Sequence, residues 1–145
     1  MLNNYKRHIF IAIVLTLFFV GCGNKEQTVL ITDLERYRDL KPDPICISVN
    51  YSDAESGEFD ITDETTIQEI MTILLEKTEF VKKDEVAAGN NGVMVLSYED
   101  GTKYRISLYR LSDSNGESYY YTSSELLDYL YNIGKENGSL TLKGL

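Results

Sequence analysis

Two strand-like runs joined by one tight turn limit most strongly what this chain can fold into. Residues 93–99 and residues 102–111 are rich in β-branched, aliphatic and aromatic side chains, and Asp100-Gly101 lies between them. A two-residue Asp-Gly connection is typical of a type I′ hairpin, because Gly tolerates the positive φ that the turn requires. We therefore expect an antiparallel hairpin whose register is set by this turn.

That register assigns each side chain of the hairpin to one face of the sheet. With Glu99 opposite Thr102, Val95 lies opposite Ile106. The face of Val93, Val95, Ile106 and Leu108 is then expected to meet the helices. The other face would be too apolar for bare solvent, which is typical of a binding surface. We predict a contact surface formed by Met94, Leu96, Tyr98 and Tyr109, unless residues 22–44 or 119–121 cover it.

Regular patterns on both sides of the hairpin predict an α+β fold. The periodicities indicate, in chain order, strands at 45–51 and 59–61, a helix at 63–78, the hairpin, a strand at 119–121 and a helix from Thr122 to near Gly138. The order is β-β-α-β-β-β-α, which favours an antiparallel sheet with two helices packed mainly on one face. We assign residues 45–145 to this single domain.

The first 22 residues have the layout of a secretory leader. Basic residues at positions 6 and 7 precede an apolar run of twelve residues at 9–20, and Gly21-Cys22 follows. Twelve helical residues span about 18 Å, which is well short of the ~30 Å hydrocarbon core of a bilayer. A cleaved leader therefore fits better than a membrane-spanning helix.

The segment Phe19-Val20-Gly21-Cys22 resembles the lipobox of bacterial lipoproteins, although Phe19 replaces the usual Leu. The chain is in this respect similar to the small, uncharacterised membrane lipoproteins of low-GC Gram-positive bacteria. The resemblance implies that residues 1–21 are a signal peptide, that cleavage occurs between Gly21 and Cys22, and that diacylglycerol is attached to the Cys22 sulfur. An uncleaved membrane anchor or an ordinary secretory leader is the alternative. Residues 22–44 would form a tether with a short helix.

Charge and residue usage exclude several classes of function. The expected mature chain has 12 basic and 23 acidic side chains, a net charge of −11. Such a surface repels phosphates, which argues against a nucleic-acid-binding role. The only histidine is His8 in the leader, so a histidine base, a histidine-activated nucleophile and a histidine-ligated zinc site are all excluded. Cys46 lies in a strand-like run and is interpreted as a small hydrophobic residue.

An acidic cluster surrounds the turn after the first expected strand: Asp53, Glu55, Glu58, Asp60, Asp63 and Glu64. Counting from Asp53, Gly57 falls at position five and Glu64 at position twelve, so the glycine is one position too early for an EF-hand loop. A solvated acidic loop at a helix N-terminus explains the cluster better, because acidic residues are favoured there.

We therefore expect no catalytic residue, no metal and no cofactor. The predicted function is that of a lipid-anchored, non-enzymatic protein on the extracytoplasmic face of the cell membrane, with a small domain that binds an envelope protein or glycan. A carboxylate-dependent cell-wall glycan hydrolase or a Ca²⁺-binding surface protein is the alternative.

Overall fold

The computed structural model describes residues 26–52, 55–85, 89 and 92–142. The leader, with Gly21 and Cys22, lies outside these residues, and so do the cleavage and lipidation that we predict there. Within the described part of the chain, no helix has both the length and the apolar character needed to cross a membrane.

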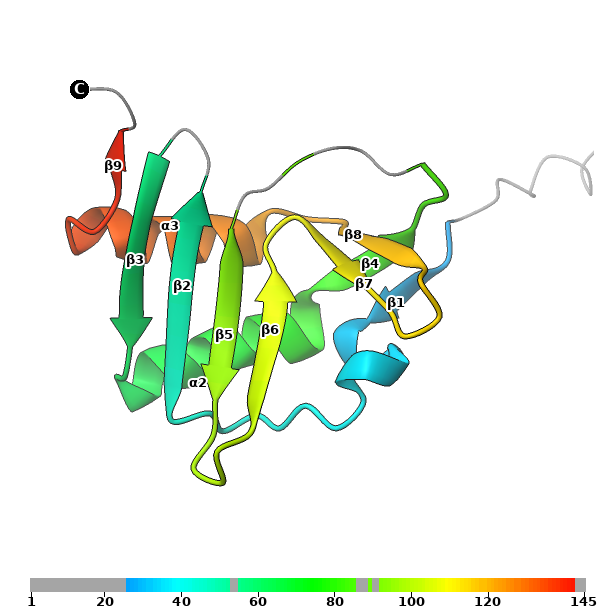
Figure 1. Cartoon of the computed structure of the whole chain (residues 1–145), viewed down its shortest axis with the longest axis horizontal. Coiled ribbons are helices and arrows are strands. Elements are labelled where there is room, and N and C mark those ends of the chain that lie inside the picture. Colours follow the sequence, from blue (N-terminus) through cyan, green and yellow to red (C-terminus); the bar gives the residue numbers. More distant parts are fainter. Residues whose placement is uncertain (1–25, 53–54, 86–88, 90–91, 143–145) are drawn as a thin grey trace, which may run out of the picture.

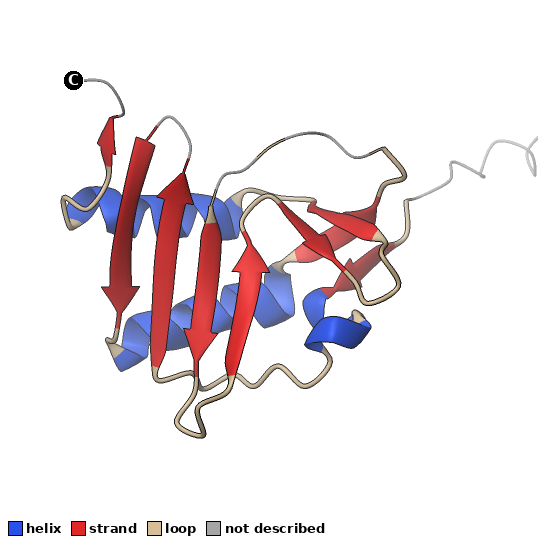
Figure 2. Cartoon of the chain, in the orientation of Figure 1, coloured by secondary structure: helices blue, strands red, loops and turns tan. Residues whose placement is uncertain are grey.

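The described residues form two antiparallel sheets and two α-helices, which confirms the α+β class (Figures 1 and 2). The strands are β1 (Thr28–Leu30), β2 (Cys46–Ser52), β3 (Glu55–Ile61), β4 (Glu79–Lys82), β5 (Val93–Ser97), β6 (Lys103–Ser107), β7 (Arg110–Ser112), β8 (Ser118–Tyr121) and β9 (Thr141–Leu142). The helices are α2 (Glu64–Thr72) and α3 (Glu125–Glu136), with 3₁₀ turns η1 (Ile31–Asp33) and η2 (Glu35–Tyr37) and a π-helical turn η3 (Ile73–Lys77) that continues α2.

Both helices lie on one face of a five-stranded sheet of order β6-β5-β2-β3-β9 (Figure 1). The helix α2 begins where the sequence predicts, because the Asp63 carboxylate caps it by accepting the Thr66 N–H at 2.9 Å. Its apolar side chains Ile67, Ile70 and Met71 are buried against the sheet. The expected cover of one face by two helices is therefore confirmed.

A second sheet, of order β1-β4-β8-β7, adjoins the first. The strand predicted at 119–121 is present as β8, but it pairs with β4 and β7 and not with the central hairpin. The expected order left out β1, β4 and β9 and treated β6 and β7 as one strand at 102–111, so one sheet was expected where the chain forms two.

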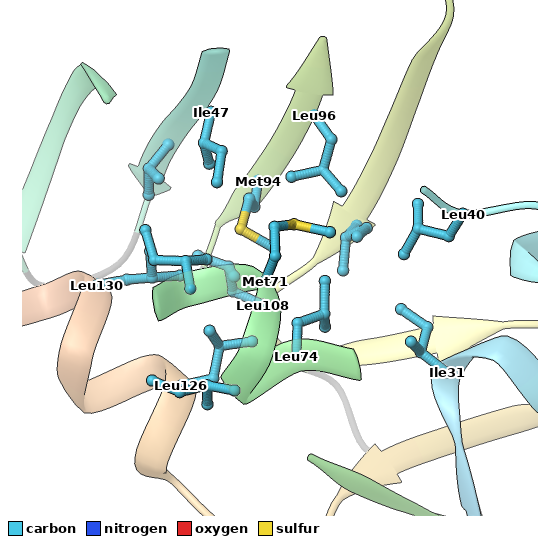
Figure 3. Packing of buried hydrophobic residues seen from close by; sticks show 14 of the residues in the cluster. Ile31, Leu40, Ile47, Met71, Leu74, Met94, Leu96, Leu108, Leu126 and Leu130 are labelled. Atoms are coloured by element: carbon cyan, nitrogen blue, oxygen red, sulfur yellow. The ribbon is translucent and has the colours of Figure 1, made fainter. Parts of the chain in front are cut away.

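The segment from Thr28 to residue 44 belongs to the folded domain. Ile31, Leu34, Tyr37 and Leu40 are all buried in the main hydrophobic cluster, and Figure 3 shows Ile31 and Leu40 within it. Their three-residue spacing matches the period of the 3₁₀ turns that carry or adjoin them. The prediction of a tether as far as residue 44 was therefore wrong from Thr28 onward.

The central hairpin is present, but its register differs from the predicted one by one residue. The Tyr98 N–H donates to the Thr102 carbonyl at 3.0 Å, and the Gly101 N–H donates to the Tyr98 carbonyl at 3.0 Å. These bonds close a three-residue loop at 99–101, in which Gly101 has a φ of 84°. Such a loop is a common alternative to the two-residue type I′ turn. Met94 consequently lies opposite Ile106, where Val95 was expected.

The one-residue shift exchanges the two faces of β5. Met94 and Leu96 are fully buried and point toward the helices, as Figure 3 shows, and Tyr98 is 6% exposed. Tyr109 lies in the turn after β6, where its ring meets the Tyr120 ring edge-on at 5.9 Å. The prediction of a contact surface made of Met94, Leu96, Tyr98 and Tyr109 was therefore wrong.

Candidate functional site

The face of the five-stranded sheet turned away from the helices is polar and open. In Figure 1 this face looks toward the viewer, with α2 and α3 behind it. Alternation along each strand places Ser48 and Asn50 of β2 on this face, next to Val93 and Val95 of β5 and Arg105 of β6. Val95 is half-exposed, unlike its neighbours Met94 and Leu96.

A groove of about 530 Å³ lies on this open face, within the usual range of ligand pockets. Strands β2, β3, β5 and β6 contribute to it, and η2 and β7 contribute at the junction with the second sheet. Among the described residues, its lining has three arginines, one carboxylate, two valines and several hydroxyl or amide groups: Arg36, Arg105, Arg110, Glu58, Val93, Val95, Ser48, Asn50, Ser52, Ser107 and Ser112, with Tyr37 and Gly92.

The charge of the groove is opposite to that of the chain, whose formal net charge is −9. Three of the four arginines among the described residues line it, against the single carboxylate of Glu58. The ion pairs between described residues all involve lysines: Lys41–Asp100, Lys77–Glu125 and Lys82–Glu117. Within that part of the chain, no carboxylate approaches the Arg36, Arg105 or Arg110 guanidinium to within 4.0 Å.

Arg110 reaches the groove because the chain turns sharply after β6. The Ser107 hydroxyl accepts the N–H groups of Tyr109 at 3.3 Å and Arg110 at 3.4 Å, which ends β6 and starts β7. The Ser107 carbonyl accepts the Tyr121 hydroxyl at 2.8 Å, and burial raises the pKa of Tyr121, so that this hydroxyl stays protonated. The Arg110 Nη1 donates to the Ser118 Oγ at 3.4 Å, which further limits the position of the guanidinium.

Arg36 is held by the turn that joins β7 to β8. Its backbone N–H donates to the Asp113 Oδ1 at 3.2 Å, and the Ser114 hydroxyl donates to the Glu35 Oε2 at 2.5 Å. The buried Tyr37 beside it has a pKa raised by desolvation, so its ring is neutral under the groove. The elements that carry Arg36 and Arg110 are therefore tied together before any ligand arrives.

Gly92 brings the start of β5 close to β2 at the edge of the groove. Its φ is 121°, and a Cβ atom there would overlap the carbonyl oxygen of Asn50. Its own carbonyl accepts the Leu108 N–H at 3.0 Å. A side chain at this position would therefore disturb the strands that form the floor of the groove.

The acidic residues near the first hairpin that the structure describes do not gather into one site. Asp53 lies outside the described residues, Glu58 lines the groove, the Asp60 carboxylate accepts the Ser48 hydroxyl at 2.6 Å, and Asp63 caps α2. Across the described ranges, no three His, Cys, Asp or Glu side chains are placed to hold a metal ion. Cys46 is a half-buried free thiol whose sulfur lies 3.9 Å from the Ser48 hydroxyl.

Little in the amino-acid sequence indicates the arginine groove. The predicted register puts Ile106 toward the helices and therefore its neighbour Arg105 on the opposite face, and the structure agrees about Arg105. Arg36 and Arg110 carry no comparable signal, because they reach the groove from a 3₁₀ turn and from a strand of the second sheet. Comparisons with protein-family models, with curated proteins and with solved structures give no match.

Proposed function

We propose that this protein is a lipid-anchored, non-enzymatic binding protein on the extracytoplasmic face of a bacterial cell membrane. Diacylglycerol on Cys22 is the anchor, and the groove on the open sheet face is the ligand site. The observation that carries the binding role is the arginine lining of a groove in an otherwise acidic chain. Guanidinium groups that have no carboxylate partner are strong, directional donors to anionic ligands.

The anchor would hold the domain near the bilayer. Each methylene buried in the bilayer contributes about 0.8 kcal/mol to the free energy of membrane binding. One acyl chain gives only reversible binding, whereas the two chains of diacylglycerol give stable attachment. The strand β1 begins at Thr28, six positions after Cys22, and six extended residues span at most about 20 Å. The folded domain would therefore lie directly above the membrane surface.

The make-up of the groove supports binding over catalysis. Glycan hydrolysis uses two carboxyl groups on either side of the scissile bond, whereas Glu58 is the single carboxylate among the described groove residues. Calcium needs six to eight oxygen ligands, and three arginines repel a cation. These features favour the binding role over both the hydrolase and the Ca²⁺-binding alternatives.

Replacing Cys22 tests the anchor. Cells that express Cys22→Ala should accumulate unprocessed precursor, and an alkyne fatty acid supplied during growth should not label it. Cys46→Ala is the matched control, because it removes the other cysteine and should be processed and labelled like the wild type. Equal labelling of the wild type and Cys22→Ala would contradict the proposed anchor.

A cell-wall digestion assay tests the non-enzymatic role. The detergent-solubilised full-length protein should release no soluble saccharide from purified cell wall, and Glu58→Gln should behave in the same way. Saccharide release by the wild type that is lost in Glu58→Gln would contradict the binding proposal and favour the hydrolase.

A further inference from the structure

We propose that the groove selects ligands that carry adjacent phosphate groups, and that Arg36, Arg105 and Arg110 bind those phosphates. This inference rests on the groove being the ligand site of the proposed function. It adds the chemical class of the ligand.

The number of charges in the groove sets the number of acidic groups in the ligand. Among the lining residues that the structure describes, three guanidiniums and the Glu58 carboxylate leave an excess of two positive charges in a groove of about 530 Å³. A ligand with one acidic group would leave at least one guanidinium unmatched. A ligand with two or more neighbouring acidic groups matches the excess.

The origin of the arginines favours phosphate over carboxylate. They come from three separate elements, η2, β6 and β7, so a ligand that contacts all three must accept hydrogen bonds from several sides. A carboxylate presents two oxygens in one plane and suits a single guanidinium. A phosphate presents oxygens in tetrahedral directions and accepts from donors on several sides.

The three arginines differ in exposure. Arg36 and Arg105 are exposed, whereas Arg110 is half-buried and bonded to Ser118. Arg36 and Arg105 can therefore be replaced with little effect on folding. Arg38 is also exposed, lies two residues from Arg36 and is not part of the groove, so it is a matched control for the loss of one positive charge.

Calorimetric titration of the full-length protein in detergent micelles tests the proposal with three soluble probes. Inorganic tripolyphosphate presents adjacent phosphates, citrate presents neighbouring carboxylates, and glycerophosphoglycerol presents the single phosphodiester of a lipid headgroup. Tripolyphosphate should bind at least about tenfold more tightly than either of the other two. Its affinity should fall as salt is added, because the contacts are between charges.

The variants assign the binding to the groove. Arg36→Gln and Arg105→Gln should each weaken tripolyphosphate binding by about tenfold, since each removes hydrogen bonds between charged groups. Arg38→Gln should bind like the wild type. Glu58→Gln should bind more tightly, because it removes the negative charge from the groove. Thermal midpoints close to that of the wild type would show that each variant is folded.

Three results would overturn the proposal. They are the absence of tripolyphosphate binding, equal binding of citrate or glycerophosphoglycerol, and an equal loss of affinity in Arg38→Gln and Arg105→Gln. None of these results would change the labelling of Cys22. A failure of phosphate selection is therefore distinguishable from a failure of the proposed anchor.

Discussion

The two faces of the five-stranded sheet can be compared within the single strand β5. Met94 and Leu96 point toward the helices and are fully buried, whereas Val93 and Val95 alternate with them and are half-exposed over the groove. All four side chains are apolar. The two faces therefore differ in which one the helices cover. The helices α2 and α3 pack against one face, and the groove lies on the other.

This comparison shows where side-chain alternation carries information and where it does not. In β2 the buried Ile47 and Val49 alternate with Ser48 and Asn50, so the sequence alone predicts which side faces the core. In β5 the side chains on both sides are apolar, so only the register of the hairpin determines which of them face the core. A one-residue change in the loop then moves every β5 side chain to the opposite face.

The largest expected effect comes from shortening one side chain on each face of β5. Leu96→Ala should lower the free energy of unfolding by about 2–5 kcal/mol, because it leaves a cavity in the core. Val95→Ala should cost less, about 1 kcal/mol, because Val95 is only partly buried. Urea denaturation of the two variants measures both values. A larger loss for Val95→Ala would mean that the two-residue turn and its register are correct after all.

Replacing each of two glycines at opposite ends of the hairpin should give the next largest difference in the free energy of unfolding. Gly101→Ala should cost about 1 kcal/mol, because a φ of 84° is strained for any other residue, although the added Cβ atom would meet no neighbouring atom within 4 Å. Gly92→Ala should cost more, because its Cβ would also overlap the Asn50 carbonyl oxygen. Urea midpoints rank the two variants. Equal losses would show that the close approach of β5 to β2 has no effect on stability.

Much of the fold follows from local pattern, whereas the groove does not. The α2 cap at Asp63 and the buried face that begins at Ile67 are visible in the sequence, because both depend on residues three or four positions apart. The groove depends on contacts between distant segments, such as the bond from the Arg36 N–H to Asp113, 77 positions away. Short strands such as β1, with three residues, and β9, with two, carry too little periodicity to be recognised.

The smallest expected effect concerns Asp100, in the loop that decides which face of β5 is covered. Hydrogen bonds from the Thr102 side chain and backbone N–H, and then from Lys41, lower the pKa of the Asp100 carboxyl to about 2. Because the pKa is lower in the folded state, the charged carboxylate stabilises the fold above the unfolded pKa of about 3.9. That contribution is lost as the pH falls toward 2.

Asp100→Asn should therefore have a lower urea midpoint than the wild type at pH 7, and the two midpoints should converge as the pH falls from about 5 to 2. The difference should be small because the Asp100 carboxylate is exposed and screened by solvent. Lys41→Gln is the matched variant, since it removes the ion pair but keeps both bonds from Thr102, and its midpoint should lie between the other two. A gap between Asp100→Asn and the wild type that stays constant from pH 7 to pH 2 would show that the side chain acts by its shape and not by its charge. The three-residue loop would then keep the register of the hairpin without help from the carboxylate.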